Sequence, residues 1–343
     1  IGSNFVLKQV QGDNNSVLNI DKLTYAGNID NLNSIAYRPN YQFIKGDISD
    51  KKLVVNTINN FQPNVIVHFA AESHVDRSID GPMEFIQTNI LGTATLLSAA
   101  LEYWIELRNN SQSTNFKFLH VGTDEVFGSL GDEGFFNENT PYDPSSPYSA
   151  SKAGSDHLVR AWYRTYNLPV LITNCSNNYG PYQFPEKLIP LIIANCIDEK
   201  TLPVYGTGKN IRDWLFVEDH CDAIYSILQT GAIGETYNIG GNNEIRNIEI
   251  VNNICLVLDE LRPRKNGKQY QELISYVKDR PGHDFRYAID SSKIKNDLGW
   301  SPKENFESGI RKTIQWYLDN ETWWRQIQDR TYNQERLGLK KSN

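Results

Sequence analysis

The chain has 343 residues, of which 39% are hydrophobic and 22% charged, and its formal net charge is −7. A chain of this length exceeds the usual single hydrophobic core, so two packed lobes are expected. The acidic balance argues against nucleic acid as a partner, and the lack of apolar runs of roughly 18 residues argues against a membrane span. The cysteines are scattered and the six histidines form no predicted ligand cluster, which predicts no metal site and suits a reducing cytoplasm. The cysteines are Cys175, Cys196, Cys221 and Cys255.

The chain opens on a predicted helix with no strand before it. Gly2 is interpreted as the last glycine of a dinucleotide-binding fingerprint, which packs the helix against a sheet, and the rest of that loop would lie upstream of residue 1. The next predicted strand, 17–21, ends at Asp21, about 20 residues after Gly2, where such folds place an acid against a ribose.

Strands and helices then alternate along the chain. This pattern predicts a parallel sheet covered on both faces, that is, an α/β fold of the Rossmann type with a doubly wound sheet. The predicted strands are 41–48, 64–71, 116–121 and 169–173, and the predicted helices are 51–61, 83–106 and 147–166.

Two adjacent carboxylates, Asp124 and Glu125, follow the predicted strand 116–121 directly after Thr123. Ligands of open α/β sheets bind at the carboxyl ends of strands, so these side chains are candidates for proton donation and abstraction at one substrate. A solvated turn is the alternative reading of the same residues.

A second motif places Tyr148 and Lys152 four residues apart on a predicted helix, so that both lie on one face. Ser146 is expected to cap this helix, with Pro147 as its first residue. The ammonium of Lys152 and a cationic cofactor ring would lower the pKa of the phenol and make Tyr148 a general base. A partly buried tyrosine beside a solvated lysine is the alternative, and the nearby carboxylate motif favours the catalytic reading.

Beyond residue 176 the pattern changes to loops and short elements, which predicts a smaller mixed α/β domain for the substrate. Arg212 and Arg280 are candidates for binding a diphosphate, with Asn177 and Asn247 as polar partners. The predicted first domain comprises 1–176 and 213–242, the second comprises 177–212 and 243–320, and 321–343 is expected to be a peripheral tail.

Together the motifs resemble the extended short-chain dehydrogenase/reductase family and, within it, the dTDP-glucose 4,6-dehydratases. The resemblance spans residues 1 to about 318, and Phe127 departs from it at a position where the family commonly has Tyr. The matching segments are 21–28, 46–48, 68–78, 123–125, 148–152, 174–181, 184–190, 212–214 and 279–284.

The resemblance implies conversion of dTDP-glucose to dTDP-4-dehydro-6-deoxy-glucose and water. Tyr148 would take the proton of the C4 hydroxyl while the C4 hydride passes to NAD, and Lys152 would hold the phenolate and the nicotinamide ribose. Glu125 would remove the C5 proton and Asp124 would protonate the departing C6 hydroxyl, after which the hydride returns to C6. Thr123 would bond near the C4 oxygen.

The resemblance also implies the ligand contacts. Asp21 favours NAD over NADP because a 2′-phosphate would meet like charge, although the neighbouring Lys22 works against that preference. Implied NAD contacts, besides Tyr148 and Lys152, are Gly2, Asp21, Lys22, Thr24, Asp47, Ile48, Ala70, Ala71, Ser73, Thr88 and Asn178. Implied substrate contacts are Ser73, Thr123, Asn177, Lys187, Leu188, Pro203, Val204, Tyr205, Arg212, Asn247, Arg280 and His283.

Other functions share parts of this pattern. A nucleotide-sugar 4-epimerase or a UDP-xylose synthase would keep NAD, Tyr148 and Lys152, but a 4-epimerase has no task for Glu125. A UDP-glucose 4,6-dehydratase would share the whole catalytic set, and a non-catalytic NAD- or nucleotide-sugar-binding protein would be expected to lose it. The helices 83–106 and 147–166 carry more apolar positions than one buried face explains, and the resemblance implies that they pair in a homodimer.

Overall fold

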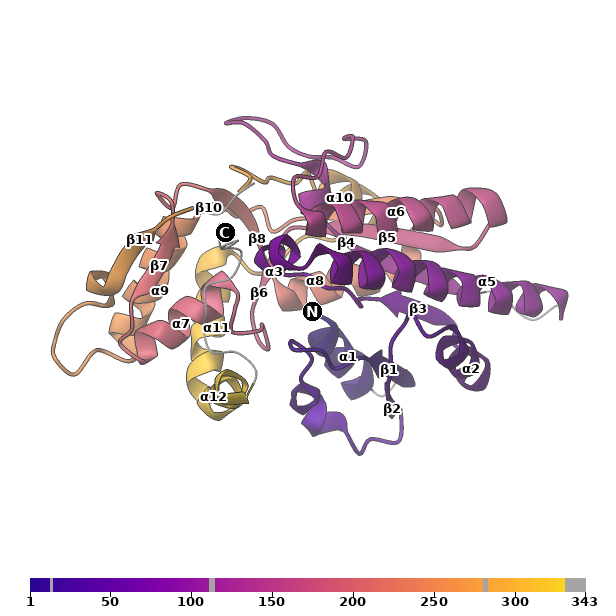
Figure 1. Ribbon diagram of the computed structural model, residues 1–343, viewed down its shortest axis with the longest axis horizontal. Helices are drawn as coiled ribbons and strands as arrows, with labels where there is room; N and C mark the ends of the chain where they lie inside the picture. The colour runs from indigo at the N-terminus through magenta and orange to yellow at the C-terminus, as the bar shows by residue number, and fades with distance from the viewer. Residues whose placement is uncertain (13–14, 111–114, 280–282, 331–343) are drawn as a thin grey trace.

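The computed structural model describes residues 1–12, 15–110, 115–279 and 283–330 (Figure 1). Its main sheet has four parallel strands in the order β3, β4, β5, β9. Neighbouring residues of β4 point to opposite faces: Phe118 joins a core with helices α2, α5 and α6, whereas Leu119 joins a core with α1 and α8. Helices therefore cover both faces, which confirms the α/β class. The strands are β3 (Val65–His68), β4 (Lys117–Thr123), β5 (Val170–Cys175) and β9 (Thr236–Ile239).

A separate parallel pair, β1 with β2, lies beside α1 and the 3₁₀ helix η1. None of the described strands pairs with both β1 and β3. An added Cβ at Gly2 would meet Phe69 at 3.7 Å, an ordinary contact distance, so the structure gives no packing reason for glycine there. The elements are α1 (Gly2–Gln11), β1 (Val17–Asp21), η1 (Ile29–Ile35), β2 (Tyr41–Lys45) and α2 (Lys51–Phe61).

The predicted helix 83–106 is one rod with a π-helical segment in it. By length and composition alone, its span Pro82–Asn109 could cross a membrane, contrary to the expectation from the sequence. The core helix of a soluble protein passes the same test, and 44% of the apolar window is buried. The rod comprises α4 (Pro82–Phe85), η2 (Ile86–Gly92) and α5 (Thr93–Asn109), and α3 (Val75–Asp80) precedes it.

Helix α6 (Pro147–Tyr166) begins where the sequence predicts it. The Ser146 hydroxyl accepts from the Ser149 amide at 3.0 Å, and the Ser149 hydroxyl accepts from the Ser146 amide at 3.0 Å. This reciprocal cap fixes the first turn, so Tyr148 has a defined place at the carboxyl end of β4.

A second hydrophobic core lies between α7, α9, α11 and the strand β8, which is hydrogen-bonded to β10 and β6. The domain limits themselves stay a prediction. The remaining elements are η3 (Asp124–Phe127), β6 (Asn177–Tyr179), α7 (Leu188–Ile197), β7 (Leu202–Tyr205), β8 (Ile211–Phe216), α8 (Val217–Thr230), β10 (Glu244–Arg246), α9 (Asn247–Leu261), η4 (Tyr270–Leu273), β11 (Ile274–Val277), α10 (Ser292–Leu298), α11 (Phe306–Asp319) and α12 (Glu321–Arg330).

The expectation of a peripheral tail from residue 321 is wrong for α12. Trp324 is fully buried in the second core, and its indole N–H donates to the Tyr317 carbonyl at 3.0 Å. Trp323 donates to the Asn31 side chain at 2.8 Å, which ties α12 to the segment after β1. Residues 331–343 lie outside the described residues.

Candidate active site

The two motifs meet at the carboxyl end of β4. Thr123 is the last residue of that strand, and its hydroxyl accepts from the Glu125 amide at 3.3 Å and lies 3.4 Å from Asp124 Oδ1. The phenol of Tyr148 lies near this hydroxyl and near Glu125, since both act on its pKa. The structure therefore brings a phenol, a hydroxyl and two carboxylates together.

Burial sets the protonation of Tyr148. The side chain is 7% exposed, and desolvation, followed by the negative charge of Glu125, raises the pKa of the phenol well above 10. The ammonium of Lys152 donates to the Val121 carbonyl at 2.8 Å. Desolvation of the phenolate is the largest effect among the protein groups, and the prediction that Lys152 and a cationic cofactor ring together lower this pKa stays a prediction.

Asp124 has the environment of a proton donor. It is 1% exposed, and burial, then Glu125 and Asp213, raises the pKa of its carboxyl well above the ordinary value. Glu125 is half-buried beside it. Two neighbouring carboxyls whose surroundings differ in this way suit one acid and one base.

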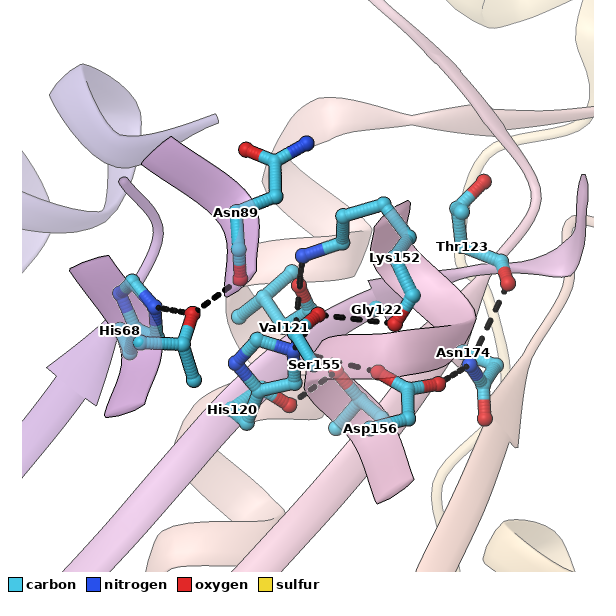
Figure 2. A network of polar contacts seen from close by, with 12 residues as sticks. His68, Asn89, His120, Val121, Gly122, Thr123, Lys152, Ser155, Asp156 and Asn174 are labelled. Carbon is cyan, nitrogen blue, oxygen red and sulfur yellow. Dashed lines mark hydrogen bonds and ion pairs between the residues drawn. The ribbon is translucent and has the colours of Figure 1, made fainter. Parts of the chain in front are cut away.

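Figure 2 shows a buried polar network that reaches Thr123, the residue before this pair. Lys152 is 4% exposed, and burial lowers the pKa of its ammonium, opposed by the charge of Asp156. Asp156 lies 3.1 Å from His120 Nε2 and accepts from Asn174 Nδ2 at 2.8 Å. Asn174 Nδ2 also donates to the Thr123 carbonyl at 3.2 Å.

Sequence reasoning missed several of these groups. Asp156 carries the one usable signal, because it follows Tyr148 and Lys152 at the same four-residue step on α6. Cys175, at the end of β5, and Tyr287, near Glu125, give no signal of their own. Burial raises the pKa of the Cys175 thiol to about 12, and the Tyr287 hydroxyl donates to Asp284 at 2.5 Å.

The implied NAD residues follow the carboxyl ends of β1, β2 and β3. Asp21 is exposed and accepts from the Leu23 amide at 2.7 Å, and Lys22 Nζ lies 2.7 Å from Asp47 Oδ2. Ile48 is buried against Gly92, where an added Cβ would approach its side chain to 2.9 Å. Thr24 is exposed near them, Ala70, Ala71 and Ser73 follow β3, Thr88 lies in η2, and Asn178 lies in β6.

The implied substrate residues gather at a second place, between α3 and the second core. Lys187 Nζ donates to the Ser73 carbonyl at 3.0 Å, and the Tyr205 hydroxyl lies 3.4 Å from Asp76. The ring of His283 lies 6.4 Å from that of Tyr205. Leu188 begins α7, and Pro203 and Val204 belong to β7 with Tyr205.

The diphosphate candidates differ in their surroundings. Arg212 is buried over the ring of Tyr287, and its guanidinium donates to backbone carbonyls, including that of Asp284 at 2.9 Å. Asn177 and Asn247 each hold a buried side-chain oxygen without a hydrogen-bond partner among the described residues. Arg280 lies outside the described residues. No three His, Cys, Asp or Glu side chains in the described ranges form a metal-binding group.

A parallel α/β fold with a tyrosine and a lysine four residues apart at its strand ends is the arrangement of short-chain dehydrogenase/reductases. More narrowly, the chain belongs to the family described as GDP-mannose 4,6 dehydratase, whose model matches residues 1–313.

Named relatives cover nearly the whole chain. It is 59% identical over 326 residues to the "Probable dTDP-glucose 4,6-dehydratase" of Sinorhizobium fredii, covering 95% of this chain and 92% of that one. It is 56% identical to the dTDP-glucose 4,6-dehydratase of Neisseria meningitidis serogroup B, covering 99% and 97%. The crystal structure of the dTDP-glucose 4,6-dehydratase from Streptomyces venezuelae, with NAD and TYD bound, matches with a TM-score of 0.86 at 43% identity, covering 95% and 96%.

Proposed function

We propose that the chain is a dTDP-glucose 4,6-dehydratase, an NAD-dependent hydro-lyase that converts dTDP-glucose to dTDP-4-dehydro-6-deoxy-glucose and water. The observation that carries this function is the catalytic junction, where Tyr148, Thr123, Asp124 and Glu125 come together at the carboxyl end of β4. Elimination of water requires an acid and a base beyond the tyrosine, and both are present here.

The residues at the strand ends fit NAD. Asp21 is exposed and offers its carboxylate to a ribose, and the small side chains of Ala70 and Ala71 leave room beside β3. The charge of Lys22 is balanced by Asp47, so the like-charge argument against a 2′-phosphate holds and NAD is favoured over NADP. When bound, NAD supplies a hydride acceptor and a positive ring charge that favours the Tyr148 phenolate.

The protein groups then divide the proton transfers. Tyr148 removes the C4 hydroxyl proton, and Lys152 keeps a positive charge below the phenol. Glu125 removes the C5 proton, which the C4 ketone has made acidic. Asp124, protonated because it is buried, gives its proton to the C6 hydroxyl, which leaves as water.

We further propose that residues 1–176 and 213–242 bind NAD and that 177–212 and 243–320 bind the nucleotide sugar. The position of Lys187, Tyr205 and His283 between α3 and the second core supports this division. Likeness to the family around Lys187 and Tyr205 favours thymidine over uridine as the base.

A homodimer is the proposed assembly. Large apolar side chains are exposed along the rod Pro82–Asn109, namely Met83 at 69%, Leu91 at 49% and Ile105 at 48%. A second copy would remove them from water. A mass in solution that stays monomeric as the concentration is raised would contradict it. The four cysteines are all free and buried, which supports a reducing, cytoplasmic location.

Mass spectrometry tests the reaction. The protein is given dTDP-glucose or UDP-glucose, each deuterated at C4. A product one water lighter that keeps the deuterium is expected from dTDP-glucose. The same result only from UDP-glucose would change the base assignment, and no loss of water from either would contradict a 4,6-dehydratase.

A further inference from the structure

We infer that Asp156 is a positioning residue that holds the two catalytic motifs in register, with Lys152 on one side and the end of β4 on the other. It touches neither proposed ligand. The inference rests on the proposed function because it depends on the roles given there to Lys152 and Thr123.

Asp156 stands one helical turn after Lys152 on α6 and is fully buried. Its Oδ2 accepts from Asn174 Nδ2 at 2.8 Å and from the Tyr142 hydroxyl at 2.8 Å. Its Oδ1 faces His120 Nε2 at 3.1 Å. Figure 2 shows the carboxylate between the His120 ring and the Asn174 amide.

The first arm runs through His120 to the ammonium. His120 Nε2 lies 3.4 Å from Lys152 Nζ as well as 3.1 Å from Asp156. The ring is neutral, because burial and the charge of Lys152 lower its pKa to about 4. Because the ring carries no charge, Asp156 is the counter-charge that Lys152 needs when buried.

No other carboxylate among the described residues raises the pKa of Lys152. Cys175 faces it from β5 and favours the ammonium less than Asp156 does. His68, on β3, lies beside the ring of His120. Burial lowers the pKa of His68, so this ring is neutral too. Arg160 reaches the network by donating to the Tyr142 hydroxyl at 2.7 Å.

The second arm runs through Asn174 to the carboxylate motif. One amide group of Asn174 donates both to Asp156 and to the Thr123 carbonyl, at 2.8 Å and 3.2 Å. An added Cβ at Gly122 would lie 2.6 Å from that amide, so the backbone of β4 is held close to it. Moving Asp156 would therefore displace the strand end from which Asp124 and Glu125 project.

Asp156→Asn is the first variant, because it removes the charge and keeps the size. We expect kcat for dTDP-glucose to fall about 10- to 100-fold, as when the partner of an active-site ligand is removed, with KM changed less than about 2-fold. The high-pH limb of kcat should move to lower pH, because Lys152 loses the charge that raises its pKa. NAD affinity, measured by calorimetry, should weaken about 3- to 10-fold.

Asp219→Asn is the matched control. Asp219 is a buried carboxylate on α8 that accepts from the Lys303 and Glu304 amides at 3.1 and 2.9 Å, and neither of these residues is among the proposed ligand contacts. It should lower thermal stability without moving the pH profile or the NAD affinity. If both variants behave alike, or if Asp156→Asn keeps kcat and the high-pH limb, the proposal is overturned.

A second pair covers the case in which Asp156→Asn fails to fold. His120→Leu should lower kcat with KM unchanged, whereas His120→Gln should restore part of it, because an amide offers oxygen to Lys152 and N–H to Asp156. Equal kcat in these two variants would also overturn the proposal. The NAD titration needs no turnover, so a wild-type protein inactive on dTDP-glucose would contradict the proposed function and not this inference.

Discussion

The catalytic junction (Thr123, Asp124, Glu125 and Tyr148) and the nucleotide-side cluster (Ser73, Asp76, Lys187 and Tyr205) differ in how far their side chains are buried. At the junction, Asp124 and Tyr148 are buried and both pKa values are raised, so the protein groups favour the protonated forms and the charge of bound NAD is needed to favour the phenolate. At the nucleotide side, Lys187 and Tyr205 are only half-buried and bridge to Ser73 and Asp76. Proton transfer needs groups whose protonation is set by burial, whereas recognition needs accessible groups held by neighbours, so variants of the two regions should fail differently.

Tyr148→Phe should have the largest effect. Without the hydroxyl, the C4 proton has no acceptor, and kcat should fall about 10⁴-fold, the upper range for a general base. The amount of dehydrated sugar formed in a fixed time at saturating substrate measures this fall in kcat. Tyr103→Phe, a buried tyrosine packed against Phe116 on α5, should leave kcat unchanged. A Tyr148→Phe enzyme with more than about a tenth of wild-type activity would remove the role of the phenol.

Variants of the two carboxylates should differ in the reaction step that they block. Glu125→Gln should abolish uptake of solvent deuterium at C5, and Asp124→Asn should slow loss of water while some uptake at C5 remains. Each should lower kcat about 10²- to 10³-fold. Mass spectrometry of sugar recovered from D₂O distinguishes them, and identical labelling in both variants would contradict the assignment of acid and base.

Acid pH should weaken the folded protein through its buried histidines. The pKa of His120 is about 4 when folded and near 6.5 when unfolded, so below pH 6.5 the unfolded chain binds more protons. Stability is then lost as the pH falls from 6.5 toward 4, by up to about 3 kcal/mol from this group. His120→Gln should flatten the pH dependence of the urea midpoint, and the exposed His157→Gln should not.

The smallest effect is expected at the nucleotide side. Lys187→Met removes a half-buried cation and its bond to the Ser73 carbonyl, so KM for dTDP-glucose should rise about 3- to 10-fold while kcat is kept. The exposed Lys52→Met on α2 is the control. A fall in kcat with KM unchanged would erase the contrast between the two regions.

Local features of the sequence predicted much of this structure. The alternating elements, the Ser146 cap and the meeting of the motifs at one sheet edge follow from periodicity and from the rule for strand ends. The raised pKa of Tyr148 did not follow, because it depends on burial by the whole fold. The contacts of Asp156 join residues far apart in sequence, His120 and Asn174, and no local pattern reports them.

The π segment η2 (Ile86–Gly92) changes which way the side chains of the long rod Pro82–Asn109 face along its length. A π turn holds about one residue more than an α turn, so the side chains beyond it are rotated relative to those before it. The near half packs against α3 and α6 beside the site, and the far half packs against α2 and α6. Asn89 sits in the segment and binds both the Glu72 backbone and Ser151. Deleting a single residue from this segment would leave a continuous helix, but the side chains of its two halves would no longer both fit against their neighbouring helices.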